Sequence, residues 1–267
     1  MKQTFEERFG KYMLRFQEAD EGFIGIVVGR SGERFSGKTV DEVRSKLVAH
    51  VLRQGTEFIG YDGAISHFLR HFPEGFDDLE YLEVRERGEK LEAARLLSEN
   101  LPVAEAVDGS GMAEIVEKVF NAIRFQLIAW QEKAIALRML RGTDGDAFVR
   151  AAARFCLSGE KADLSRLKAV AANNEADKWT IVTYLPWLWQ PERHMFLKPE
   201  ATKSFAKRVG HAFQIVYENG DSYETYTSCT NLAGEILAKA AKIGPRDNID
   251  AQGFIWVSEK YPRLNES

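Results

Sequence analysis

Residues 111–141 read GMAEIVEKVFNAIRFQLIAWQEKAIALRMLR, without proline or internal glycine. The apolar residues recur three and four positions apart, which is the spacing of one face of an α-helix. We predict one unbroken central helix, roughly 45 Å long at about 1.5 Å per residue. Ile115, Ile128 and Ile135 widen the apolar stripe, which indicates packing against two partners. The stripe itself consists of Met112, Val116, Val119, Ile123, Leu127, Trp130, Ala134 and Leu137.

Helical spacing continues on both sides of this stretch. Pro73 and Pro102 each follow a helical pattern that they would stop, because proline cannot continue a helix. Residues 213–217 alternate like a short strand, whereas residues 250–257 fit either a buried strand or a short helix. The further predicted helices cover residues 58–72, about 77–100, 143–156, 162–173, 199–209 and 223–243.

The first 56 residues predict a small unit made of a helix, a β-hairpin and a second helix. Four large apolar residues between Phe5 and Phe16 have helical spacing, which predicts an amphipathic helix within residues 1–20. Residues 23–28 alternate like a strand, a Gly-Arg-Ser-Gly turn follows, and residues 34–36 form the return strand.

The predicted fold class is mainly α: a multi-helix bundle with a small N-terminal β-hairpin and one or two short strands in the C-terminal part. Residues 1–56 form the N-terminal helix/hairpin/helix unit. Residues 57–175 form a helical core, and residues 176–267 form a mostly helical part packed on that core. The polar stretch from Asn173 to Asp177 is the expected break between the last two parts.

Composition and charge narrow the range of functions. The 267 residues are 45% hydrophobic, enough for a substantial core, and the net charge of −4 argues against a surface wholly committed to nucleic acid or anionic lipid. Two isolated cysteines, Cys156 and Cys229, favour small buried side chains in a reducing compartment. Residues 1–8 are charged, so we expect no signal peptide, no membrane partner and a cytoplasmic location.

Gly32 to Thr39 matches the phosphate-binding pattern G-x-x-x-x-G-K-[ST] at every specified position. In a nucleotide site the first glycine follows a strand directly, whereas here a turn intervenes. Asp41 and Glu42 would also compete with phosphate for the donors at the helix N-terminus. We therefore favour a hairpin and a helix capped by Thr39, with Glu42 completing a capping box. A P-loop-like nucleotide hydrolase is the alternative.

The sequence predicts no catalytic residue, no metal site and no cofactor. His67 and His71 are one helical turn apart, but the phenylalanines beside them favour packing against the core over zinc binding. No Glu-x-Lys or Asp-x-Lys occurs, although nucleases of the restriction type usually place an acidic residue two positions before a lysine. A metal-dependent nuclease that gathers Asp247, Asp250 and Gln252 is the alternative.

Three stretches resemble an uncharacterised family of conserved bacterial proteins. They are residues 60–76, with GYDGA and FLRHFPEGF, residues 190–199, QPERHMFLKP, and residues 249–257, IDAQGFIWV. The resemblance covers most of the chain and implies no activity, cofactor or site residue. The third stretch is also faintly similar to segments of restriction-associated proteins, which implies a role around foreign DNA.

A basic surface is the best candidate for contact with phosphate. Lys203 and Lys207 are one turn apart on a helix, so we expect them to project together into solvent. An ordinary solvated helix face is the alternative. The surface consists of Arg193, His194, Lys198, Lys203, Lys207 and Arg208, with a small pocket of Tyr61, Arg70 and His71 expected beside it.

These observations favour a non-enzymatic interaction protein. We expect an accessory component of a bacterial, defence-related system that binds the nucleic-acid backbone without reading bases. A metal-dependent nuclease and a nucleotide hydrolase are the enzymatic alternatives. The second alternative is a structural subunit that binds another protein through residues 179–189, a region rich in tryptophan.

Overall fold

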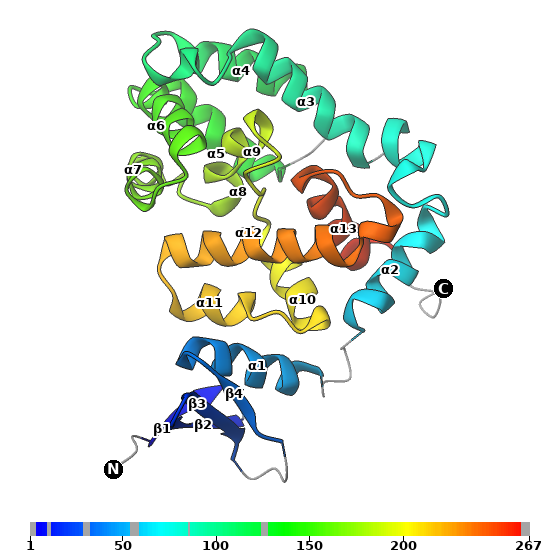
Figure 1. Cartoon of the computed structure of the whole chain (residues 1–267). Helices are drawn as coiled ribbons and strands as arrows, with labels where there is room; N and C mark the ends of the chain where they lie inside the picture. Colours follow the sequence, from blue (N-terminus) through cyan, green and yellow to red (C-terminus); the bar gives the residue numbers. More distant parts are fainter. Residues whose placement is uncertain are drawn as a thin grey trace.

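The structure is a computed structural model that describes residues 4–9, 12–28, 33–53, 59–84, 86–123 and 128–262. Helices dominate, and the strands form one sheet at the N-terminal end, which confirms the predicted mainly α fold class (Figure 1). The helices are α1 (Val40–Arg53), α2 (Gly60–His71), α3 (Glu86–Asn100), α4 (Met112–Ala122), α5 (Trp130–Arg141), α6 (Gly145–Ser158), α7 (Lys161–Ala172), α8 (Trp179–Val182), α9 (Tyr184–Trp189), α10 (Pro199–Val209), α11 (Phe213–Asn219), α12 (Ser222–Lys239) and α13 (Asn248–Lys260). Short 3₁₀ turns at Gly75–Asp77, Glu105–Val107 and Ala241–Ile243, and a π-helical turn at Glu80–Val84, connect some of them. Within the described residues, no helix has both the length and the apolar character needed to span a bilayer.

The N-terminal unit is a four-stranded antiparallel sheet covered by α1. Its strands, β1 (Thr4–Phe9), β2 (Tyr12–Ala19), β3 (Gly22–Val27) and β4 (Phe35–Gly37), lie in the sheet in chain order. The pairing of β3 with β4 confirms the predicted hairpin, whose turn lies outside the described residues. Helix α1 approaches closely at Gly25, where a Cβ atom would lie 2.5 Å from Val43 and 2.6 Å from Leu47.

The predicted helix within residues 1–20 is wrong, because this segment forms β1 and β2. A separation of four residues, as between Phe5 and Phe9, returns to the same side of a strand as well as of a helix. Phe5 and Phe16 face each other across the two strands, and their stacked rings have centroids 5.0 Å apart. Met13 points to the opposite face of the sheet and is 36% exposed.

The predicted central helix is also wrong, because α4 and α5 are separate helices. Ile123 follows α4 with an extended backbone (φ −68°, ψ 113°), and the predicted core residue Leu127 lies outside the described residues. The break changes which face of the second half is buried: Met139 is 0% exposed, whereas Trp130 is 69% exposed. Because α4 and α5 pack against each other, the wide stripe belongs to two helices that face one core.

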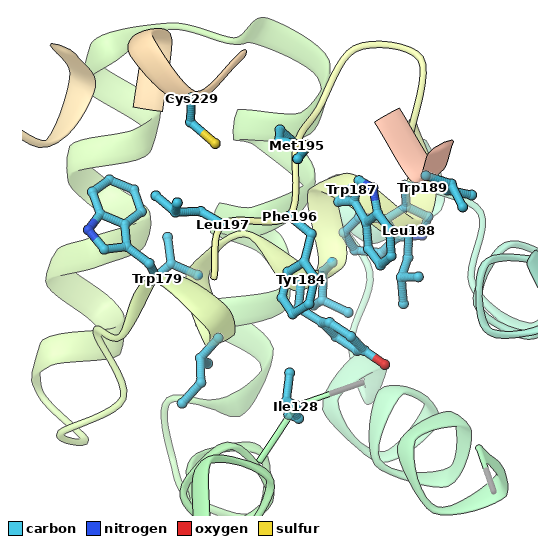
Figure 2. Packing of buried hydrophobic residues seen from close by; sticks show 14 of the residues in the cluster. Ile128, Trp179, Tyr184, Trp187, Leu188, Trp189, Met195, Phe196, Leu197 and Cys229 are labelled. Carbon is cyan, nitrogen blue, oxygen red and sulfur yellow. The ribbon is translucent and has the colours of Figure 1, made fainter. Parts of the chain in front are cut away.

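One large core contains most of the buried side chains, including the region rich in tryptophan. Residues 179–189 form α8 and α9, and every side chain among them is buried. Figure 2 shows Trp187 beside Phe196, and the two stacked rings have centroids 5.0 Å apart; residues 195–197 follow α9 in a segment without helix or strand. This burial contradicts the expected role of residues 179–189 as a protein-binding surface.

A second, smaller core joins the N-terminal unit to the rest of the chain. It contains residues of β2, β3 and α1, together with Ile215 of α11. Phe213, two positions earlier, belongs to the large core. Positions two apart lie on opposite sides of a helix, so α11 packs into both cores. The alternation of residues 213–217 arises from this arrangement, and the predicted strand is wrong. Residues 250–257 form no strand either, since they are part of α13.

Candidate functional site

Lys198 is anchored by a buried segment without helix or strand that belongs to the large core. Residues 195–197, directly before it, are at most 1% exposed. The backbone N–H of Leu197 donates to the Thr183 hydroxyl oxygen at 3.0 Å. Pro199 then begins α10 directly after Lys198. Because the backbone is fixed on both sides, the Lys198 side chain leaves the core at a defined point.

The Lys198 ammonium group lies against aromatic rings and not against a carboxylate. Its Nζ atom is 4.1 Å from the centroid of the Trp256 ring and 5.4 Å from that of Phe196. Within the described residues, this Nζ atom takes part in no hydrogen bond or ion pair. Lys198 and Trp256 are both partly exposed, so the lysine lies at the edge of the core.

Two further lysines surround this position, and we refer to Lys90, Lys198, Lys260 and Trp256 as the lysine cluster. Lys260 lies one turn after Trp256 on α13, and its Nζ atom is 5.9 Å from the centroid of the same ring. Lys90 comes from α3 and is 4% exposed. Its Nζ atom is 2.7 Å from a carboxylate oxygen of Glu86.

The electrostatics of the lysine cluster follow from this geometry. Burial, and after it the Lys90 ammonium, lowers the pKa of Lys198 to about 8, against the opposing effects of Glu86 and Glu132. Desolvation and a neighbouring like charge are the expected causes of such a shift. A group with a shifted pKa on a fixed backbone at the edge of the core is a candidate for a functional site.

Residues 60–76, 190–199 and 249–257 meet around α13. The side chain of Asn248 donates to the His194 carbonyl oxygen at 3.0 Å, which joins the second stretch to the start of α13. Phe254 packs on Phe68 with 5.4 Å between ring centroids, which joins the third stretch to the first. Segments far apart in the sequence therefore surround the helix that carries Trp256 and Lys260.

The predicted basic surface does not form one continuous face. His194 is 3% exposed and contacts the Tyr226 hydroxyl at 3.0 Å and the Cys156 carbonyl at 2.8 Å. Burial lowers the pKa of His194, which favours the neutral imidazole. Arg208 is 4% exposed and bound to Glu259 at 2.8 Å, which removes it from contact with solvent.

The other three predicted residues remain at the surface, fully or in part. The Lys203 ammonium is 2.7 Å from Glu200, and Lys207 is exposed. Arg193 is exposed as well, and its guanidinium group donates to the Leu157 carbonyl oxygen at 3.2 Å. Of the six residues predicted for this surface, Lys198 is the one that belongs to the lysine cluster.

Tyr61, Arg70 and His71 do not gather into a pocket. Tyr61 lies in the first turn of α2, and its hydroxyl donates to Glu235 on α12 at 2.9 Å. His71 lies at the opposite end of the same helix, where its ring contacts the Pro262 carbonyl oxygen at 3.2 Å. Arg70, beside it, is exposed. The ten-residue separation places the two ends about 15 Å apart.

Asp247 and Asp250 are held by an arginine. Arg87 Nη2 is 2.7 Å from Asp247 and Arg87 Nη1 is 2.8 Å from Asp250. The Tyr81 hydroxyl also donates to Asp250, which is 0% exposed. We refer to Tyr81, Arg87, Asp247 and Asp250 as the Arg87 network. Carboxylates engaged in this way are structural ion pairs and leave no open ligand set for a nuclease metal.

The helix end behind the P-loop-like pattern is occupied by the chain itself. Glu42 accepts from the backbone N–H of Lys38 at 2.8 Å, and the Thr39 hydroxyl oxygen accepts from the backbone N–H of Glu42 at 3.2 Å. Thr39 therefore caps α1, although the Glu42 carboxylate reaches Lys38 and not Thr39. Hydrogen bonds from Lys46 and from the Lys38 backbone lower the pKa of Glu42. This carboxylate occupies a donor that a nucleotide phosphate would need; Gly32 lies outside the described residues.

His67 and His71 are oriented by the backbone and not for metal binding. The Nε2 atom of His67 is 3.2 Å from the Val257 carbonyl oxygen, so it carries the proton, as Nε2 of His71 does beside Pro262. The described residues contain no group of three or more His, Cys, Asp or Glu side chains arranged to hold a metal. Both cysteines are buried free thiols.

Sequence reasoning missed the partners of Lys198. Lys90 precedes Lys198 by 108 positions, and Trp256 and Lys260 follow it by 58 and 62 positions, so spacing along the chain does not bring them together. One signal was present: Trp256 and Lys260 are four residues apart, which places them on the same face of a helix. This spacing predicts a shared face only if residues 250–257 are assigned to a helix.

Comparison of the chain with protein-family models, with curated proteins and with solved structures finds no match.

Proposed function

We propose that the protein is a non-enzymatic interaction protein that binds the phosphate backbone of nucleic acid at the lysine cluster. The observation that carries this proposal is the Lys198 ammonium group, held beside Trp256 without a carboxylate partner among the described residues. A phosphate oxygen would supply the missing negative charge. Backbone contacts of this kind position a ligand but do not read its sequence.

Single-stranded nucleic acid suits this site better than a duplex. An aromatic ring with cations beside it is typical of proteins that bind single strands, where a base contacts the ring and the cations contact phosphate. Duplex binding relies on a more extended set of phosphate contacts. Here His194 and Arg208 are buried, Lys203 is paired with Glu200, and the net charge is −4.

The test is a fluorescence-anisotropy titration with a labelled single-stranded oligonucleotide of mixed sequence, at pH 6.5 and at two salt concentrations. Lys198→Met should weaken binding at least tenfold and reduce the logarithmic salt slope by about 1. Lys203→Met is the matched control and should bind as the parent does, because its ammonium is already paired with Glu200. A parent protein that binds neither DNA nor RNA at low salt would refute the proposal.

We also infer a cytoplasmic, accessory role in a bacterial system that acts against foreign nucleic acid. The support is the similarity of residues 249–257 to segments of restriction-associated proteins and the two buried, unpaired cysteines. Phages should then form more plaques on a host that carries the Lys198→Met protein than on a host that carries the parent protein. Equal plating of a phage panel on both hosts and on a deletion strain would speak against this role.

A further inference from the structure

Strand β1 forms one edge of the N-terminal sheet. It pairs with β2 on one side, and within the described residues no strand pairs with its other side. An edge strand presents backbone N–H and C=O groups that a further strand can bind. β1 has six residues, whereas β4 at the opposite edge has three. Of the two edges, β1 is therefore the one that offers a longer row of these groups.

The side chains of β1 alternate between the two faces of the sheet. Phe5, Glu7 and Phe9 lie on the face that α1 covers, where both phenylalanines pack against the smaller core and remain partly exposed. Glu6 and Arg8 lie on the opposite face and are exposed. The smaller core is therefore incompletely covered at this edge, beside a row of charges of both signs.

We propose that two copies of the chain associate by antiparallel pairing of β1 with β1, about a two-fold axis at Glu7. In this register Phe5 lies opposite Phe9 of the second copy, and Glu6 lies opposite Arg8 of the second copy. The two-fold axis repeats both pairs. Aromatic pairs and pairs of opposite charge across two strands stabilise an antiparallel sheet. The two four-stranded sheets then form one continuous sheet with both copies of α1 on the same face.

Other antiparallel registers of the described strand are less favourable. A shift by one position turns the side chains of one copy to the wrong face of the sheet. An axis at Glu6 or at Arg8 sets a charge opposite an identical charge and a phenylalanine opposite Glu7. The axis at Glu7 also brings two carboxylates together, but Arg44 of the same chain already donates to each, at 2.9 and 2.7 Å. The charges of β1 therefore favour a single register.

The experiment is sedimentation velocity on the full chain over a series of protein concentrations. One pair of edge strands buries little area, so we expect the parent to change from monomer to dimer as its concentration rises. Arg8→Glu sets Glu6 opposite a glutamate and should weaken dimerisation at least tenfold. Arg34→Glu is the matched control, because it makes the same change of charge at an exposed position directly before β4. It should dimerise as the parent does. A parent that stays monomeric up to its solubility limit would refute the proposal.

Mixing two variants tests the register itself. Glu6→Arg sets an arginine opposite Arg8 in its own dimer, just as Arg8→Glu sets Glu6 opposite a glutamate. Each variant alone should therefore be mostly monomeric. In a mixture, every one of these pairs joins opposite charges, so the heterodimer should form at least tenfold more tightly than either homodimer. A variant that had only lost its fold would not regain association in this way. A mixture that stays monomeric while the parent dimerises would overturn the register.

The open face of the sheet is the rival surface for a second copy. Gly25 and Val27 of β3 face α1 or the smaller core, so Ile26 between them points to the open face, where it is partly exposed. Ile26→Thr should leave dimerisation unchanged. Loss of the dimer in this variant, without an effect of Arg8→Glu, would place the interface on the open face and reject the pairing of β1.

This proposal does not rest on the lysine cluster, so the two can fail separately. A parent that dimerises but binds no oligonucleotide would reject the proposed function and keep the pairing of β1. A parent that binds oligonucleotide but remains monomeric would reject the pairing of β1 and keep the proposed function.

Discussion

The Arg87 network and the lysine cluster both connect α3 with α13, but they differ in how their charges are paired. In the Arg87 network, two carboxylates contact one guanidinium group at 2.7 and 2.8 Å. In the lysine cluster, Lys198 lies 4.1 Å from the centre of an indole ring and has no acidic contact among the described residues. Charges that the fold requires are paired, because an unpaired buried charge is costly. An unpaired cation at the edge of the same interface is therefore the stronger indication of a ligand.

Removing Arg87 should have the largest effect. Arg87→Met removes the closest counter-charge of Asp247 and of Asp250, which is 0% exposed and keeps Arg246 at 3.7 Å. We expect the free energy of unfolding to fall by about 3 to 5 kcal/mol in a urea titration monitored by tryptophan fluorescence. The matched control is Arg95→Met on the same helix, whose pairs with Glu92 and Glu99 are exposed. Arg95→Met should change the free energy of unfolding by no more than about 0.5 kcal/mol. An equal loss of stability in both variants would show that the Arg87 network contributes no more to stability than an exposed ion pair.

Replacing Lys198 should affect binding and not stability. Lys198→Met removes a desolvated charge that lacks a partner, so the free energy of unfolding should stay the same or rise by about 1 kcal/mol. Oligonucleotide affinity should nevertheless fall at least tenfold, which corresponds to about 1.4 kcal/mol. Paired measurements of urea unfolding and anisotropy on one preparation would check both. Destabilisation comparable to that of Arg87→Met would mean that Lys198 has a structural role like that of Arg87.

The affinity of the lysine cluster for phosphate should depend on pH. With a pKa of about 8, Lys198 is mostly charged at pH 7 and mostly neutral at pH 9. Oligonucleotide affinity should therefore fall by up to about tenfold as pH rises through 8. Lys198→Arg stays charged throughout this range and should bind with little dependence on pH. An equally steep fall in this variant would place the titrating group elsewhere.

The same pKa shift predicts a change in stability with the opposite trend. A lysine in the unfolded chain has a pKa of about 10.4, so between pH 8 and 10.4 the unfolded state binds more protons at this position than the folded state does. The contribution of Lys198 to stability therefore rises with pH across this window. A series of urea titrations should show the rise in the parent and not in Lys198→Met.

The smallest effect on stability is expected at the P-loop-like pattern, where the Glu42 carboxylate accepts a hydrogen bond from the Lys38 backbone N–H. Thr39→Ala removes the cap of α1 and should lower the free energy of unfolding by about 1 kcal/mol. Lys38→Ala should change stability by less than half of that, since only the backbone of Lys38 donates to Glu42. Addition of ATP and Mg²⁺ should leave the melting temperature of all three proteins unchanged. A rise in the parent that Lys38→Ala abolishes would make this helix end a nucleotide site.

Helix-rich character and the main helix positions could be predicted, because apolar spacing over ten or more residues distinguishes a helix from a strand. Short segments were ambiguous. Phe5 and Phe9 fit both periods, and only the alternation of Leu14, Arg15, Phe16 and Gln17 marks a strand. The backbone becomes extended at Ile123, directly after α4. This break could not be predicted, because residues 111–141 contain neither proline nor internal glycine.

The candidate site could be predicted only in part. Lys198 was among the predicted residues, but its importance comes from Lys90 and Trp256, which reach it through tertiary packing. His194 and Arg208 were placed on the surface because sequence shows charge and not burial. His194 follows an exposed arginine and precedes the buried residues 195–197, so the change from surface to core occurs within one residue. Patterns of charge alone do not locate such a change.

The Arg87 network also sets an order of events during synthesis. Arg87 bonds to a residue 160 positions later, and Tyr81 to one 169 positions later. While the ribosome is still translating the middle of the chain, the guanidinium group lacks its native partners Asp247 and Asp250. Contacts of such long range close late and slowly. These contacts between the two ends of the helical region can therefore form only after α13 has been synthesised. A nascent chain that stalls before residue 247 should be accessible to proteases and chaperones over much of its length.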